Sequence, residues 1–125
     1  MAIKISGTAI INDARTVQNY GIVQNALGSG SGARTIDLTA GNFISATVAG
    51  ATTWTFSNPL ASPAATGFIL QLTNGGSAAI TWPSGIKWAG GTAPTLTASG
   101  IDVLTFITPD GGTTWRGVVS ALDSK

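Results

Sequence analysis

The chain has 125 residues, a net charge of +1 and neither histidine nor cysteine. This length fits one domain with a single core. Charged residues make up only 9% of the chain, against about a quarter in an ordinary soluble domain. Such a charge gives no electrostatic case for binding nucleic acid or an anionic membrane, and the lack of cysteine excludes disulfides and thiol catalysis. A weakly charged surface favours permanent association with other chains.

The N-terminal part differs in pattern from the rest of the chain. Residues 1–27 hold two short apolar stretches and a mixed segment, and the pentapeptide GSGSG follows them. Gly/Ser composition is typical of flexible linkers. The sequence therefore predicts an N-terminal arm over 1–27, a linker over 28–33 and a β-domain over 34–125. No apolar run is long enough for a signal peptide or a membrane span, so we expect a soluble protein made inside a cell.

The remainder indicates an all-β fold, because short β-branched and aromatic segments alternate with Gly, Pro, Asn and Asp turns. The predicted strands are Thr35–Leu38, Phe43–Val48, Thr52–Ser57, Gly67–Thr73, Ala78–Trp82, Asp102–Thr108 and Thr114–Ser120. The segment IDVLTFIT is apolar on both faces, which favours a central strand.

Two hairpins are expected, one around Asn74-Gly75-Gly76 and one around Asp110-Gly111-Gly112. Seven short strands in some 90 residues predict a small β-sandwich or a jelly-roll-like domain, preceded by the extended arm.

The residues available for catalysis are few. Acid–base chemistry would fall to five aspartates, one tyrosine and three lysines, and no two carboxylates have a suggestive spacing. Asp37 and Asp102 occupy strand positions that can face solvent, whereas Asp13, Asp110 and Asp123 fall in turns or near an end. No phosphate loop, dinucleotide motif or calcium loop is present. We therefore expect a protein that is not an enzyme and that has neither a cofactor nor a metal.

The tryptophans raise the question of a ligand. Trp82 follows Ala78 and Ile80 on one strand face, and Trp54 shares a face with Phe56, so both are expected in the core. Trp88 lies in a loop context, where its ring could cover the core, contact a neighbouring subunit or bind a ligand. In a carbohydrate-binding module, Trp82, Trp88 and Trp115 would form the platform for a sugar ring.

Two stretches carry a resemblance to a known group of proteins. The opening IKISGTAIINDAR resembles an N-terminal segment of virion proteins of tailed phages, particularly cyanophages. The stretch ITWPSGIKWAGGTAPTLTASGIDVLTFITPDGGTTWRGVV is similar to a β module of tail-fibre and head-associated proteins in the same group. The residues that carry this match are Trp82, Pro83, Lys87, Trp88, Gly91, Pro94, Leu96 and Asp110 to Trp115. Together the two stretches span most of the chain.

The resemblance implies a structural virion protein without catalytic residues, in which the tryptophan segment clamps the end of a β-sandwich. A single domain of about 90 residues is only a few nanometres across, too short for a fibre. We therefore expect a capsid cement, or decoration, protein on the capsid surface, made in the host cytoplasm. The alternatives are a short tail fibre or adsorption protein that binds host polysaccharide, and a carbohydrate-binding module.

The expected partners are the major capsid protein and other copies of the chain in a homotrimer, with host glycan only in the alternative reading. The arm is expected to dock by strand addition on a neighbouring copy or on the capsid protein. The predicted partner-binding residues are Ile3, Ile5, Ile10, Ile11, Tyr20, Ile22, Val23 and Trp88.

Overall fold

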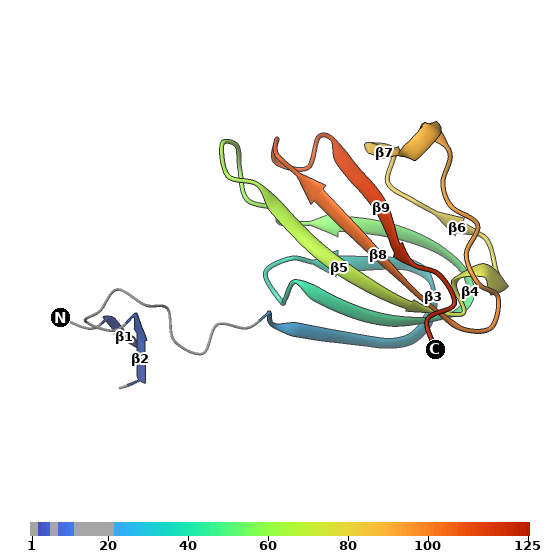
Figure 1. The fold of residues 1–125 in the computed structure, drawn as a ribbon, viewed down its shortest axis with the longest axis horizontal. Helices are drawn as coiled ribbons and strands as arrows, with labels where there is room; N and C mark the ends of the chain where they lie inside the picture. The colour runs from blue at the N-terminus through green and yellow to red at the C-terminus, as the bar shows by residue number, and fades with distance from the viewer. Residues whose placement is uncertain (1–2, 6–7, 12–21) are drawn as a thin grey trace.

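A computed structural model describes residues 3–5, 8–11 and 22–125 of the chain (Figure 1). Strands β1 (Ile3–Ile5) and β2 (Thr8–Ile11) pair antiparallel and form a two-stranded sheet. The predicted arm over 1–27 lies partly outside the described residues, and Tyr20 is among those outside. The expected docking of the arm therefore stays a prediction.

The all-β prediction is confirmed, because the other seven strands form one hydrogen-bonded sheet in the order β3-β4-β5-β8-β9-β7, with β6 paired to β4. These strands are β3 (Gln24–Asp37), β4 (Phe43–Ser57), β5 (Thr66–Thr73), β6 (Ile80–Thr81), β7 (Ile86–Trp88), β8 (Ile101–Thr108) and β9 (Trp115–Ala121). Two short 3-10 turns, η1 (Gly75–Ser77) and η2 (Ala89–Gly91), interrupt the chain between β5 and β8.

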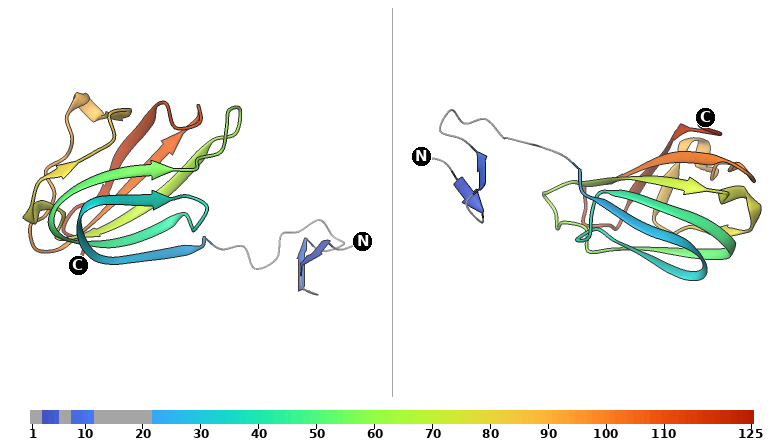
Figure 2. Two further views of the ribbon diagram at one scale, coloured as in Figure 1. Left: turned by 180° about the vertical axis from the view of Figure 1, so that it is seen from behind. Right: turned by 90° about the horizontal axis from the view of Figure 1, so that it is seen from below.

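Strands β3 and β4 each turn back on themselves (Figure 2). They run parallel, with Gln24 opposite Phe43 and Asp37 opposite Ser57, although only residues 38–42 connect them. Parallel neighbours ordinarily need a crossover of about a dozen residues or more. Here the second half of β3 is itself the return path, because it brings the chain back to the side where the first half began.

This doubling back creates two layers with the core between them. Strand β5 pairs with the first half of β4 over Phe43–Thr47, whereas β6 pairs with its second half at Thr52 and Thr53. Alternate side chains from both halves of β4 are buried and belong to one apolar cluster, as the two-residue period of a strand requires. The arrangement is therefore sandwich-like, as the sequence predicted.

The linker predicted over 28–33 is wrong, because this segment is the bend inside β3, and β3 remains paired to β4 on both sides of it. The left-handed φ values at the bend, 69° for Gly28 and 74° for Gly32, explain why glycine occurs there. The Arg34 side chain closes the bend by donating hydrogen bonds to the carbonyl oxygens of Leu27 at 3.1 Å and Gly28 at 3.0 Å. The β-domain therefore begins before the glycines, not after them.

Some predicted strands and turns are confirmed and others are corrected. The hairpin around Asp110–Gly112 joins β8 and β9, and β8, the IDVLTFIT strand, lies between β5 and β9 inside the sheet. The hairpin predicted around Asn74–Gly76 is wrong, because β5 pairs with β8 and not with the strand that follows it. The two strands predicted over Phe43–Val48 and Thr52–Ser57 are the two halves of β4.

Candidate interaction site at the tryptophan loop and the sheet edge

Residues 80–96, here called the tryptophan loop, carry two indole rings onto the core. Trp82 and Trp88 meet edge to face with ring centroids 5.5 Å apart, and each ring lies 5.6 Å from the ring of buried Phe106. Both tryptophans are half-buried and pack against the core cluster. Trp82 thus contacts the core as predicted. Trp88 covers the core with one side of its ring, and the rest of the ring is exposed to solvent.

A glycine in β9 makes room for Trp88. An added Cβ at Gly117 would stand 2.7 Å from Cζ3 of the Trp88 ring, closer than any side chain can approach. Gly117 is buried and lies opposite Trp88 in the parallel pairing of β7 and β9. The indole is therefore seated directly on the backbone of the sheet, and the loop is held by this contact.

The other two tryptophans are core residues. Trp54 and Trp115 are both 2% exposed. The Trp115 ring lies 5.3 Å from Phe56 and 5.5 Å from Phe68 in edge-to-face contacts. Trp115 consequently cannot belong to a surface platform, which corrects the three-tryptophan sugar site considered from the sequence.

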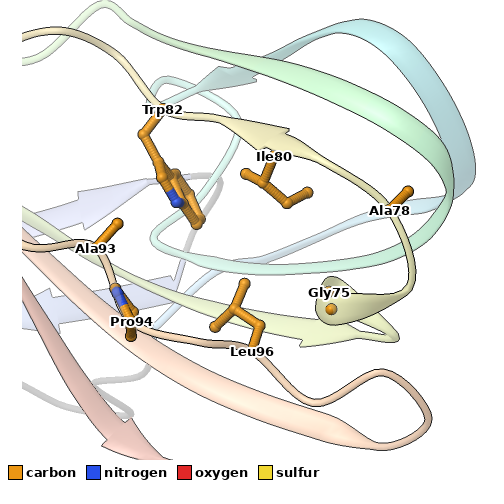
Figure 3. A pocket seen from close by; sticks show the side chains of 8 residues that line it. Gly75, Ala78, Ile80, Trp82, Ala93, Pro94 and Leu96 are labelled. Carbon is orange, nitrogen blue, oxygen red and sulfur yellow. The ribbon is translucent and has the colours of Figure 1, made fainter.

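The tryptophan loop encloses a hollow of about 170 Å³ between its two limbs (Figure 3). Figure 3 shows Ile80 and Trp82 on one limb facing Pro94 and Leu96 on the other. The side chains that line it carry no polar atom other than the indole N–H of Trp82. A saccharide needs placed hydrogen-bonding groups for specific recognition, so this hollow suits an apolar group better than a sugar.

A second hollow, of about 390 Å³, lies at the edge of the sheet where β7 ends. Its lining combines the Trp88 ring with Pro94, Val118 and Val119, and Thr92 supplies the one hydroxyl group. Strand β7 pairs only with Trp115–Gly117, so the Val118–Ala121 part of β9 has no neighbouring strand on that side among the described residues. This hollow therefore adjoins an open strand edge.

The aspartates of the described part have structural surroundings. Asp102 is fully buried, contrary to the expectation that it can face solvent, because it accepts hydrogen bonds from Thr97 N at 2.7 Å, Thr97 Oγ1 at 2.7 Å and Asp123 N at 2.9 Å. It thereby fastens the C-terminal segment and Thr97, the residue that follows the tryptophan loop, to β8. Neither hollow has a titratable side chain in its lining.

Hydrogen bonds lower the pKa of half-buried Asp37 and of exposed Asp110. The Asn58 amide, followed by the hydroxyl and backbone N–H of Thr39, lowers the pKa of Asp37. The backbone N–H of Thr114, 2.8 Å from Oδ1, is the main cause that lowers the pKa of Asp110, and the Thr108 hydroxyl contributes as well. Both carboxylates cap turns, which is the role expected for Asp110 from its sequence context.

The predicted partner-binding residues other than Tyr20, which lies outside the described residues, belong to different segments of the structure. Ile22 and Val23 are 54% and 63% exposed at the entry to β3. Ile3 and Ile5 lie on β1, Ile10 and Ile11 lie on β2, and Trp88 lies at the opposite edge strand, β7.

Sequence reasoning missed two exposed aliphatic residues on the outer face of the sheet. Ile107 is 46% and Val118 is 56% exposed, and they lie on the neighbouring strands β8 and β9. The segment IDVLTFIT, which is apolar on both faces, is the signal that could have indicated Ile107, but a central strand is also expected to be buried on both faces. In the described part of the chain no helix has the length and apolar character to cross a membrane, and no cluster of three acidic, His or Cys side chains occurs there.

No known protein family, curated protein or solved structure matches the chain.

Proposed function

We propose that this protein is a non-enzymatic structural component of a tailed-phage particle, a capsid cement protein that sits on the outer capsid and stabilises contacts between capsomers. The virion setting comes from the resemblance of the opening segment and of the tryptophan loop to phage virion proteins. The cement role comes from the compact sandwich-like domain, which suits a surface position better than the long reach of a fibre.

One observation carries the structural role. The two hollows at the tryptophan loop are lined mainly by apolar side chains, and the larger one adjoins an open edge of β9, where the side chains of Ile107 and Val118 are exposed. Open strand edges and exposed aliphatic patches are features of protein contact surfaces. Catalysis would need titratable groups or a metal in such a hollow.

The N-terminal segment supplies the second contact in this proposal. Its apolar residues Ile3, Ile5, Ile10, Ile11 and Tyr20, with Ile22 and Val23, attach the domain to the major capsid protein or to a neighbouring copy by strand addition. The molecule assembles as a homotrimer, whose symmetry matches three-fold positions between capsomers. Light scattering of the purified chain tests this assembly, and a monomer at micromolar concentration would contradict it.

The alternative function is a short tail fibre or adsorption protein that holds host polysaccharide, since the same β module resembles parts of tail-fibre proteins. The exposed part of the Trp88 ring and the nearby Thr92 hydroxyl are the groups that such a function would use. Binding of the full chain on a glycan array would favour this alternative over the cement role.

Copy number in purified particles separates the two functions. A cement protein covers the shell and is present in far more copies than a fibre, which occurs at few positions on the tail. Quantitative mass spectrometry against the major capsid protein gives the ratio, and immunogold labelling shows the location. Label on the tail, or a ratio typical of a fibre, would refute the cement role.

A further inference from the structure

Two cations lie side by side at the β7–β9 edge of the sheet. Lys87 and Arg116 are direct partners in the parallel pairing of these strands, and both side chains are exposed. Their neighbours along each strand point to the other face, because Trp115 and Gly117 are buried and Ile86 and Trp88 pack on the core. Lys87 and Arg116 therefore project from the same outer face at adjacent positions.

No carboxylate of the described residues forms a salt bridge with Lys87 or Arg116. The salt bridge found in that part of the chain joins Lys125 to Asp123 at 2.8 Å. Asp102 is buried, and the Oδ1 atoms of Asp37 and Asp110 accept the hydrogen bonds that shape their own turns. Like charges directly opposite on neighbouring strands destabilise a sheet, so the fold itself gains nothing from placing them together.

Apolar groups surround the two cations. Ile107 is the partner of Arg116 on β8, and Val118 is the next outward residue of β9. Val118 also lines the hollow of about 390 Å³, together with Trp88. The outer edge thus combines two positive charges, two exposed aliphatic side chains, an apolar hollow and an unpaired stretch of strand over Val118–Ala121.

We propose that this edge is a docking surface for an extended acidic segment of another protein, in which carboxylates alternate with apolar side chains. Such a segment would continue the line of β7 along β9, place its carboxylates near Lys87 and Arg116, and insert an apolar side chain into the hollow. A polypeptide fits better than an anionic glycan, because the side chains of the lining offer only the hydroxyl of Thr92 and the indole N–H of Trp88 as polar groups. This inference rests on the proposed function as a structural protein that binds other chains, and it adds the chemistry of the partner segment.

A peptide titration followed by NMR tests this surface on the full chain. The probe is a short capped peptide of alternating aspartate and valine, and its counterpart alternates lysine and valine. We expect the aspartate peptide to shift the amide signals of Lys87, Trp88 and Arg116–Val119 and the indole N–H signal of Trp88. Added salt should weaken this binding, because exposed charges are screened.

Charge variants show whether the two cations matter. The double variant Lys87→Asp/Arg116→Asp should weaken binding of the aspartate peptide by at least about tenfold, whereas Lys125→Asp, a cation change elsewhere, should leave it unchanged. Arg116→Asp alone sets opposite charges side by side, so it should raise Tm while it weakens peptide binding. A purely structural role for the pair would not produce these opposite effects.

Three results would overturn the proposal: no shift with the aspartate peptide, equal binding of the lysine peptide, or unchanged binding by the double variant. The titration uses no phage particles, so it can succeed even if the copy-number measurement refutes the cement role. Conversely, if the protein is abundant on capsids but does not bind the acidic peptide, the proposed function stands and this inference is refuted.

Discussion

The contact between Trp88 and Gly117 decides whether the tryptophan loop stays on the sheet. Gly117→Ala would place a methyl group 2.7 Å from Cζ3 of the indole, so the ring must move away. We expect this overpacking to cost about 1 to 3 kcal/mol in the free energy of unfolding. Urea denaturation measures that cost, and a change in tryptophan fluorescence in the folded state reports the displaced ring.

Gly67→Ala is the matched control, because it also replaces a strand glycine but its new methyl group would stand 3.4 Å from the nearest atom, the Phe106 carbonyl oxygen. This variant should be much closer to wild type in stability. Equal losses in the two variants would show that the backbone of the strands, rather than the Trp88 seat, is responsible.

The stability lost when a tryptophan is replaced by alanine should increase with the burial of that tryptophan. Trp54 is 2% exposed and stacks under the Arg34 guanidinium, whose central carbon lies 5.2 Å from the ring centroid. Trp54→Ala should therefore cost the full amount for a buried aromatic, about 3 to 5 kcal/mol. Trp82 is half-buried, so Trp82→Ala should cost roughly half as much. Thermal unfolding of both variants tests the order, and a larger loss for Trp82 would contradict it.

At the scale of single elements, the Asp110 turn between β8 and β9 makes the stability of the fold depend on pH. The fold lowers the pKa of Asp110 below its ordinary value of 3.8, chiefly because the Thr114 N–H donates to the carboxylate. A depressed folded pKa means that the stabilisation is complete above this ordinary value and is lost as the pH falls through the folded pKa. Asp37, whose pKa is lowered mainly by Asn58, should act in the same direction.

We therefore expect the free energy of unfolding to decrease as the pH falls below about 4. Asp110→Asn removes one titrating group, so it should reduce the slope of stability against pH in that range. Urea unfolding between neutral pH and strong acid measures the slope. An identical slope in the variant would show that Asp110 titrates alike in the folded and unfolded chain.

Local signals predicted those elements whose partners lie close in sequence. The Asp110-Gly111-Gly112 turn marked the β8–β9 hairpin because the two strands that it joins pair with each other. The Asn74-Gly75 turn misled, because a turn signal does not reveal the partner of a strand. Here β5 forms its antiparallel hydrogen-bonded pair with β8, and residues 74–100 separate the two strands in sequence. The pairing of Lys87 with Arg116 was hidden for the same reason, since β7 and β9 are parallel and distant in sequence.

The bend of β3 shows a second limit of sequence reasoning. Glycine and serine are typical of a flexible linker, and the same residues permit a sharp bend with left-handed φ at Gly28 and Gly32. What distinguishes the two is the hydrogen bonding of Arg34 to the carbonyls of Leu27 and Gly28, and to that of Thr47 at 3.2 Å in β4. These are tertiary contacts, and the composition of the segment does not predict them.

At the scale of the whole molecule, the place where the domain begins can be tested by truncation. A chain that starts at Ile22 keeps β3 complete, whereas a chain that starts at Ala33 loses the half of β3 that pairs with Phe43–Val48. It also loses the Leu27 and Gly28 carbonyls that accept hydrogen bonds from Arg34. The first half of β4 would then become an open edge beside buried Ile44 and Val48.

We therefore expect the chain from Ile22 to retain the circular dichroism spectrum of a β-protein, with a Tm close to that of the full chain. The chain from Ala33 should unfold at a distinctly lower temperature or aggregate, because an exposed apolar edge invites pairing between molecules. If the chain from Ala33 were as stable as the chain from Ile22, the glycine segment would behave as a linker after all. Only the truncation that keeps β3 can show whether the N-terminal segment attaches the domain to particles, since a failure of the shorter chain would report lost folding rather than lost docking.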